Sequence, residues 1–139
     1  MKLHINLNPP TILFLFTLFA LLAFKPIISL QEGWEVPAKY KTMENPTADD
    51  DEAMDIGAEL YTQHCKSCHG KTGLGDGPKS AELDTDSGDF STSEFQQQTD
   101  GELYYKTSFG RDDMPAFDKK ISDDDERWMI VTYLRSFEE

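Results

Sequence analysis

Cysteine is scarce in this sequence: Cys65 and Cys68 are the only two in 139 residues. A disulfide between them would close too small a loop to stabilise much. A thioredoxin-like redox pair is not indicated, because no strand–helix–strand pattern surrounds the C-x-x-C. A zinc site would need a second pair of ligands elsewhere in the chain, and the sequence offers none. The two thiols therefore need another partner.

Basic charge is also in short supply, since 13 Lys and Arg face 26 Asp and Glu, a formal net charge of −13. Without residues 1–30, which hold two lysines and no acid, the charge becomes −15. This balance argues against nucleic acid or an anionic membrane as a partner of the folded part. It favours either a basic docking partner or solubility alone, and both interpretations stay open.

Strand-like alternation and internal repeats are absent, so the helical patterns decide the class as all-α. At 139 residues the chain has room for one folded domain. We divide it into a leader at 1–30, a strap or linker at 31–52 and a folded domain at 53–139. The strap holds apolar side chains such as Trp34 and Tyr40, so part of it is expected to lie on the domain.

The leader has a charged start at Lys2 and an unbroken apolar run from Ile12 to Phe24, the layout of an export signal. Ile27-Ile28-Ser29 is a poor cleavage site, so two outcomes stay open. Residues 11–30 also match the roughly 20 residues of a membrane-spanning helix. The domain is expected outside the cytoplasm, in the periplasm, either soluble or anchored to the membrane by this segment.

The strongest signal is Cys65-Lys66-Ser67-Cys68-His69, a C-x-x-C-H motif. This is the attachment signature of c-type haem. Two thiols three residues apart can each form a thioether with one vinyl group of the same porphyrin. The adjacent His69 is then carried beneath the iron as its proximal ligand. The sequence predicts one covalently bound haem c.

Three helices are expected around this motif. The first runs from about Glu52 to Cys68, with Gly57, Tyr61 and other small or apolar residues on one face. A capping box of Thr99 and Glu102 starts a short helix that ends near Gly110. Ser122 to Asp125 cap a last helix that is rich in aromatic residues.

The long loop after the motif, from Gly70 to Gln98, is suited to wrapping around a haem edge. A backbone carbonyl near Gly77 or Pro78 is expected to accept a hydrogen bond from Nδ1 of His69 and so orient the imidazole. Tyr61 is expected to cover the haem edge beside the crossing of the helices. His64 is expected to pack, not to bind iron.

Met114 is the expected distal ligand of the iron. It lies in a loop, and Pro115 holds its backbone extended, so that its thioether can reach the iron. Of the other candidates, Met54 shares a helix with the attachment site, Met129 lies beside a core tryptophan, and Met43 is in the strap.

Several motifs together resemble class I c-type cytochromes over about residues 53–137. They are Gly57 and Tyr61 before C-x-x-C-H-G, Gly-Asp-Gly-Pro at 75–78, Met114-Pro115-Ala116-Phe117, and the aromatic last helix. The resemblance implies three to four helices and long loops around one covalently attached haem. It also implies that the first and last helices cross, with Gly57 and Tyr61 meeting the region from Val131 to Leu134. One thioether edge of the haem would be exposed.

The expected function is electron transfer outside the cytoplasm by a single-haem cytochrome, as a carrier or a tethered domain of a respiratory chain, and not catalysis. Expected partners are redox proteins with basic docking surfaces, such as a quinol–cytochrome c oxidoreductase, a dehydrogenase or a terminal oxidase. Two alternatives stay open: an electron-transfer subunit of an oxidoreductase complex, and a gas-binding sensor if Met114 is not a ligand.

Overall fold

The computed structural model describes residues 33–138, so the predicted leader and its cleavage or anchoring lie outside the described part. The elements are helical: α2 (Ala38–Lys41), α3 (Asp51–His64), α4 (Lys66–His69), a 3-10 turn η1 (Ser80–Glu82), α5 (Ser93–Gln96), α6 (Asp100–Phe109) and α7 (Asp124–Arg135). Within residues 33–138 the β-type pairing is confined to one isolated bridge between Arg111 and Met114. The predicted all-α class is confirmed. The same residues include no helix with the length and apolarity to cross a membrane.

Helix α3 begins at a side-chain cap. The Asp50 carboxylate accepts hydrogen bonds from the backbone N–H groups of Glu52 (2.9 Å) and Ala53 (3.3 Å). These are two of the donors that a helix start leaves without a partner. The helix therefore starts one residue before the predicted position.

The predicted single helix to Cys68 is wrong, because it is interrupted at Cys65. There φ is −113° and ψ is −38°, and a separate turn, α4, follows. The Cys65 carbonyl accepts from the N–H groups of both Cys68 (3.1 Å) and His69 (3.0 Å). A carbonyl shared between the third and fourth residues tightens the turn beyond α-helical spacing. The motif thus occupies its own short helix.

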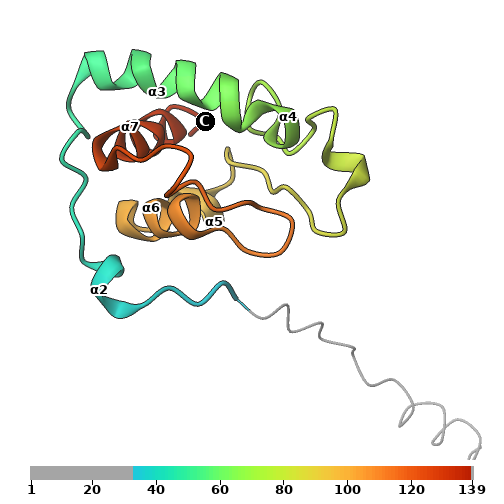
Figure 1. The fold of residues 1–139 in the computed structure, drawn as a ribbon, viewed down its shortest axis with the longest axis horizontal. Coiled ribbons are helices and arrows are strands. Elements are labelled where there is room, and N and C mark those ends of the chain that lie inside the picture. Colours follow the sequence, from blue (N-terminus) through green and yellow to red (C-terminus); the bar gives the residue numbers. More distant parts are fainter. Residues whose placement is uncertain (1–32, 139) are drawn as a thin grey trace, which may run out of the picture. The chain divides into compact units, whose positions relative to one another are not determined.

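Helices α3 and α7 cross in close contact, as predicted, and Figure 1 shows them side by side. A Cβ atom placed on Gly57 would lie 2.1 Å from the Met129 carbonyl oxygen and 3.0 Å from Cβ of Tyr133. Only glycine allows the two backbones to come this near. Tyr133 belongs to the predicted contact region, and the contact extends back to Met129.

Local caps position α6 and α7. The predicted capping box is present: Thr99 Oγ1 accepts from the N–H of Glu102 (3.2 Å), and the Glu102 carboxylate accepts from the N–H of Thr99 (2.9 Å). Asp123 caps α7 through the N–H of Asp125 (2.9 Å). The two helices pack through Tyr104 and Trp128, whose stacked rings have centroids 4.1 Å apart.

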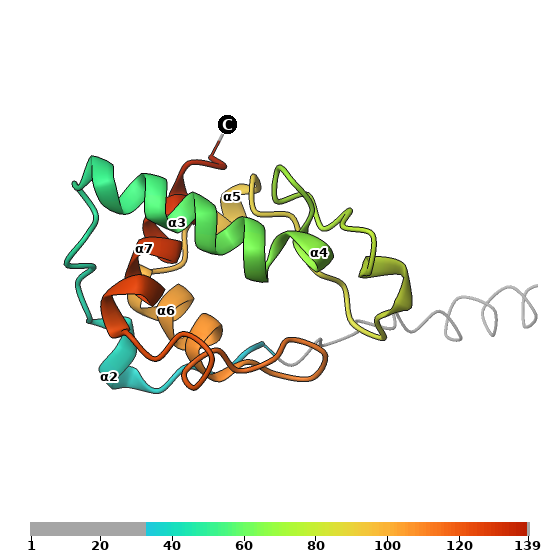
Figure 2. The same cartoon turned by 45° about the horizontal axis from the view of Figure 1, so that its top comes forward.

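Residues from Glu35 onward form one compact unit, so most of the predicted strap packs on the helices. Helix α2 lies against α6, where a Cβ on Gly101 would lie 1.8 Å from the Tyr40 carbonyl oxygen (Figure 2). Further along, Asn45 Nδ2 donates to Thr132 Oγ1 (3.0 Å), and the hydroxyls of Thr47 and Thr132 lie 2.9 Å apart. The strap is thereby fastened to α6 at one end and to α7 at the other.

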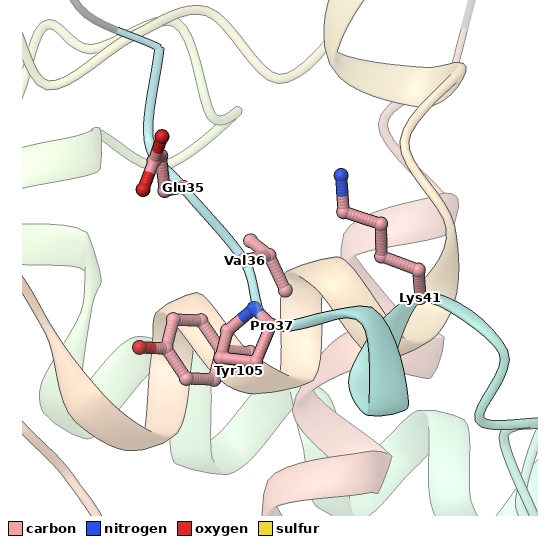
Figure 3. A pocket seen from close by; sticks show the side chains of 5 residues that line it. All are labelled: Glu35, Val36, Pro37, Lys41 and Tyr105. Atoms are coloured by element: carbon pink, nitrogen blue, oxygen red, sulfur yellow. The ribbon is translucent and has the colours of Figure 1, made fainter.

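A groove of about 420 Å³ lies where the strap passes α6 (Figure 3). It is lined by Glu35, Val36, Pro37, Lys41 and Tyr105. None of these is a residue that the sequence predicted to hold haem.

Candidate haem site

The two thiols are free and partly buried. Burial, together with the nearby Cys68, raises the pKa of the Cys65 thiol to about 12, and Lys120 opposes the rise only weakly. Such surroundings favour a neutral sulfur over a thiolate, so they suit a thioether better than a thiolate metal ligand. In the described part of the chain, no three His, Cys, Asp or Glu side chains gather to hold a metal ion.

His69 lies against the buried Phe90, with ring centroids 4.6 Å apart. Burial lowers the pKa of His69, although the backbone of Ser87 acts in the opposite direction. A lowered pKa keeps the imidazole neutral at pH 7, which is the form that binds a metal. The ring is therefore prepared as an iron ligand.

Nδ1 of His69 is buried and has no hydrogen-bond partner. The predicted bond from this atom to a carbonyl at Gly77 or Pro78 is not made in the structure. An orphaned polar atom in a buried ring is rarely left without a reason. Nδ1 of His64 and the hydroxyl of Ser87 are also buried without a partner, so the C-x-x-C-H motif, and not this feature, identifies His69 as the expected proximal ligand.

The loop after α4 nevertheless packs tightly on the motif. Backbone N–H groups of Gly75, Gly77 and Lys79 donate to the carbonyls of His69 (3.0 Å), Cys68 (3.1 Å) and Ser67 (2.9 Å), respectively. A Cβ on Gly77 would lie 2.5 Å from the Ser67 carbonyl oxygen. Pro78 sits in this fastened segment with an exposed side chain. Its role toward the haem stays a prediction.

Met114 is partly buried and closes a tight turn. Its N–H and carbonyl exchange hydrogen bonds of 2.9 Å with the backbone of Arg111. The turn needs Asp112 at a φ of 51°, a conformation uncommon outside glycine. A Cβ on Gly110 would lie 2.3 Å from the Met114 carbonyl oxygen. The methionine backbone is therefore closely restrained.

The carboxylate of Asp113 joins the two loops of the site, which lie on the same side of the helices in Figures 1 and 2. Its Oδ2 accepts from the N–H of Asp84, the N–H of Thr85 and the hydroxyl of Thr85, each at 2.9 Å. The bonds from Thr85 are the main reason that the pKa of Asp113 is lowered. The sequence did not predict this contact between the loops, because nothing distinguishes Asp113 from the many other acidic residues of the chain.

The other candidate residues differ in their surroundings. Met43 is 38% exposed in the strap, and the Met129 backbone faces Gly57. The His64 ring lies 6.0 Å from that of Phe117, and burial lowers the pKa of His64. Met54 is partly buried within α3.

Tyr61 is fixed by contacts within the protein, and its predicted cover of the haem edge stays a prediction. Its hydroxyl donates to the Gly70 carbonyl (2.8 Å), and only 1% of the residue is exposed. Its ring lies 5.3 Å from those of both Tyr133 and Phe137. Tyr61 thus connects α3, α7 and the start of the loop that follows the motif.

The comparisons with known proteins agree with this geometry. The family model described as "Cytochrome C oxidase, cbb3-type, subunit III" matches residues 52–134. The chain belongs to this family of c-type cytochromes. A search of curated proteins gives no match.

Two solved structures are similar. The first is the "Kuenenia stuttgartiensis reducing HAO-like protein complex Kustc0457/Kustc0458", with 30% identity over 64% of this chain and a TM-score of 0.58. This chain covers 45% of that one, less than half of its length. The second is the "KustC0563 c-type cytochrome", with 29% identity, a TM-score of 0.52 and coverage of 60% of this chain and 98% of that chain.

The cytochrome therefore binds haem c covalently, and the residues at the motif fit that group. Both thiols are free, burial raises the pKa of the Cys65 thiol and lowers the pKa of His69, and Nδ1 of His69 has no hydrogen-bond partner. The single C-x-x-C-H motif corresponds to one haem. When bound, haem supplies a one-electron redox centre.

Proposed function

We propose that this cytochrome transfers single electrons outside the cytoplasm, with its haem iron held between His69 and Met114. The observation that carries the proposal is that one compact unit holds both the C-x-x-C-H helix and a methionine whose backbone is fixed in a tight turn. A histidine and a methionine together fill the two axial positions of haem iron and raise its reduction potential. Electron transfer needs no open position, whereas substrate binding at iron does.

The protein's own contribution is to hold and shield. Cys65 and Cys68 fix the ring in place, and His69 provides a neutral nitrogen. Phe90 packs against the His69 ring. It also stacks on Phe95, with ring centroids 4.3 Å apart. These two rings would keep water away from the His69 side of the haem. The cytochrome is proposed to be a carrier and not a catalyst, because a histidine and a methionine at the two axial positions would leave no open position at iron for a substrate.

The proposed location is the periplasm, either soluble or tethered by residues 11–30. The apolar run from Ile12 to Phe24 supports export. Mass spectrometry of the soluble and membrane fractions tests this, because one measurement reports both haem addition and retention of the leader. Haem-loaded protein confined to the cytoplasm would contradict export.

Proposed partners are redox proteins with basic docking surfaces, because the chain carries a formal charge of −13. A second role, as an electron-transfer subunit of an oxidoreductase, is favoured by one comparison: a similar structure comes from a HAO-like protein complex. Co-purification under mild conditions distinguishes the two. A stoichiometric partner indicates a subunit, and a single species indicates a free carrier.

Replacement of Met114 tests the ligation. Met114→Ala should lose the weak ferric absorption near the red end of the spectrum that sulfur ligation gives. It should also gain carbon monoxide binding in the ferrous form and have a lower reduction potential, because a thioether favours ferrous iron. Absorption spectra with and without carbon monoxide measure the first two effects.

Met129→Ala and Met43→Ala are the matched controls. Both should keep the wild-type spectrum, and Met129→Ala should only lower stability. If Met114→Ala keeps the wild-type spectrum, or if the wild type already binds carbon monoxide readily, Met114 is not the ligand. The open-site result would favour a gas-binding sensor instead.

A further inference from the structure

The loop that carries Met114, residues 110–123, is held at its base by one buried arginine. Arg127 lies in the first half of α7, and only 5% of the residue is exposed. Few arginines are buried to this degree unless every donor is satisfied. The arrangement of its partners explains what the side chain does.

All five N–H groups of the guanidinium have acceptors within the fold. Nε donates to Ser108 Oγ (3.1 Å). One terminal nitrogen, Nη1, donates to the carbonyls of Ile121 and Asp123, the latter at 3.3 Å. The other, Nη2, donates to the Tyr104 hydroxyl (3.0 Å) and to the Asp124 carboxylate. Tyr104 also places its ring 5.5 Å from the guanidinium carbon. The positive charge of Arg127 is thus paired with the Asp124 carboxylate and lies beside the Tyr104 ring.

These acceptors lie at both ends of the loop. Ser108 stands two residues before it, at the end of α6, while Ile121 and Asp123 form its last residues. The Ser108 carbonyl in turn accepts from the N–H groups of Phe117 and Asp118, each at 3.0 Å, in the middle of the loop. The Arg127 side chain therefore connects the two ends of the segment, and the Ser108 backbone connects the first end to the middle.

We propose that Arg127 is the positioning residue for Met114: by clamping both ends of the loop, it holds the thioether where it can bind iron. The inference rests on the proposed ligation by Met114. A thioether prefers ferrous iron, so a loosened loop should lose the methionine first in the ferric form. Lysine cannot replace the arginine, because an ammonium offers three donors and no planar fork.

A second arginine on the same helix provides a matched control. The Arg135 guanidinium also donates hydrogen bonds to several acceptors. They are the Asp100 carboxylate, the Gln96 carbonyl and side-chain oxygen, and the Gln98 carbonyl. Its partners all lie in residues 96–100, away from the Met114 loop. Arg127→Lys and Arg135→Lys therefore remove similar networks from different segments.

The test compares both variants as haem-loaded proteins. Arg127→Lys should weaken the red-end ferric absorption, lower the reduction potential and bind carbon monoxide about tenfold faster, since losing one hydrogen bond to a charged group is enough to shift an equilibrium about tenfold. Arg135→Lys should move only the urea midpoint. If Arg127→Lys does not accumulate, Ser108→Ala is used, because it removes only the link between Arg127 and the start of the loop.

Two results would overturn the inference: wild-type ligation signatures in the Arg127 or Ser108 variant, or equal changes in the Arg127 and Arg135 variants. A wild type that lacks the red-end absorption would overturn the proposed ligation first, and the inference with it. The two failures are therefore distinguishable in the wild-type spectrum.

Discussion

At the residue scale, the site depends on side chains that are kept neutral. The Cys65 thiol has a raised pKa and His69 a lowered one, and burial is the main cause in both. Desolvation disfavours the charged form of each group. Of these two groups, the imidazole in its neutral form is the one that can bind the iron.

The covalent link can be tested on the two cysteines. Wild-type protein should keep its colour after acid–organic extraction, and Cys65→Ala combined with Cys68→Ala should lose it, because no thioether can form. Ser67→Ala should behave as the wild type, although Ser67 Oγ lies 3.8 Å from the Cys68 sulfur. Extraction followed by absorption measurement decides the matter. Free extraction of haem from the wild type would refute covalent attachment.

Features that depend on residues close together in the sequence could be predicted from it. The capping box from Thr99 to Glu102 spans four positions, and the C-x-x-C-H motif spans five, so each is visible without the fold. The crossing at Gly57 was predictable because a glycine inside an apolar helical face has few other reasons to be there.

Contacts between distant residues could not be predicted in the same way. Asp113 bonds to Thr85, 28 positions away, and Asn45 bonds to Thr132, 87 positions away. Nothing in the sequence distinguishes Asp113, which accepts three hydrogen bonds from Asp84 and Thr85, from the other acidic residues. The break at Cys65 was also hidden, because the apolar helical period continues through it.

At the element scale, the α3–α7 crossing is a close approach of two helices for which a glycine is required. Gly57→Leu should lower the free energy of unfolding by about 1–3 kcal/mol, as overpacked core sites do, because the new side chain meets the Met129 backbone. Urea denaturation measures the change. Glu59→Leu, at an exposed position of the same helix, should be nearly neutral. An unchanged midpoint for Gly57→Leu would contradict the crossing.

The strap depends on a second, polar contact with α7. Thr132→Val should lower the free energy of unfolding by about 1–3 kcal/mol, because it leaves the part-buried Asn45 Nδ2 without its acceptor and removes the hydroxyl that donates to the Thr47 carbonyl. Thr42→Val serves as the control, since Thr42 is exposed and has only a 3.5 Å bond to Lys39. Thermal melts of the two variants should separate. Equal melts would mean that the strap contributes nothing to stability.

At the scale of the whole molecule, the main feature is the formal net charge of −13. Electron transfer to a basic protein partner should slow steeply as ionic strength rises from low to physiological, because salt shortens the reach of the field. Stopped-flow kinetics measures this, and reduction by a small uncharged reagent is the control that should not respond. A rate to the protein partner that ignores salt would leave the acidity as a solubility feature.

The surroundings of Cys65 also bear on how the molecule is assembled. Burial raises the pKa of this thiol to about 12, and thiolates, not thiols, are the reactive form. We therefore expect haem to be attached more readily to an open chain than to one that has already folded. A chain that folds before haem arrives would have to open again around Cys65 before the thioether can form.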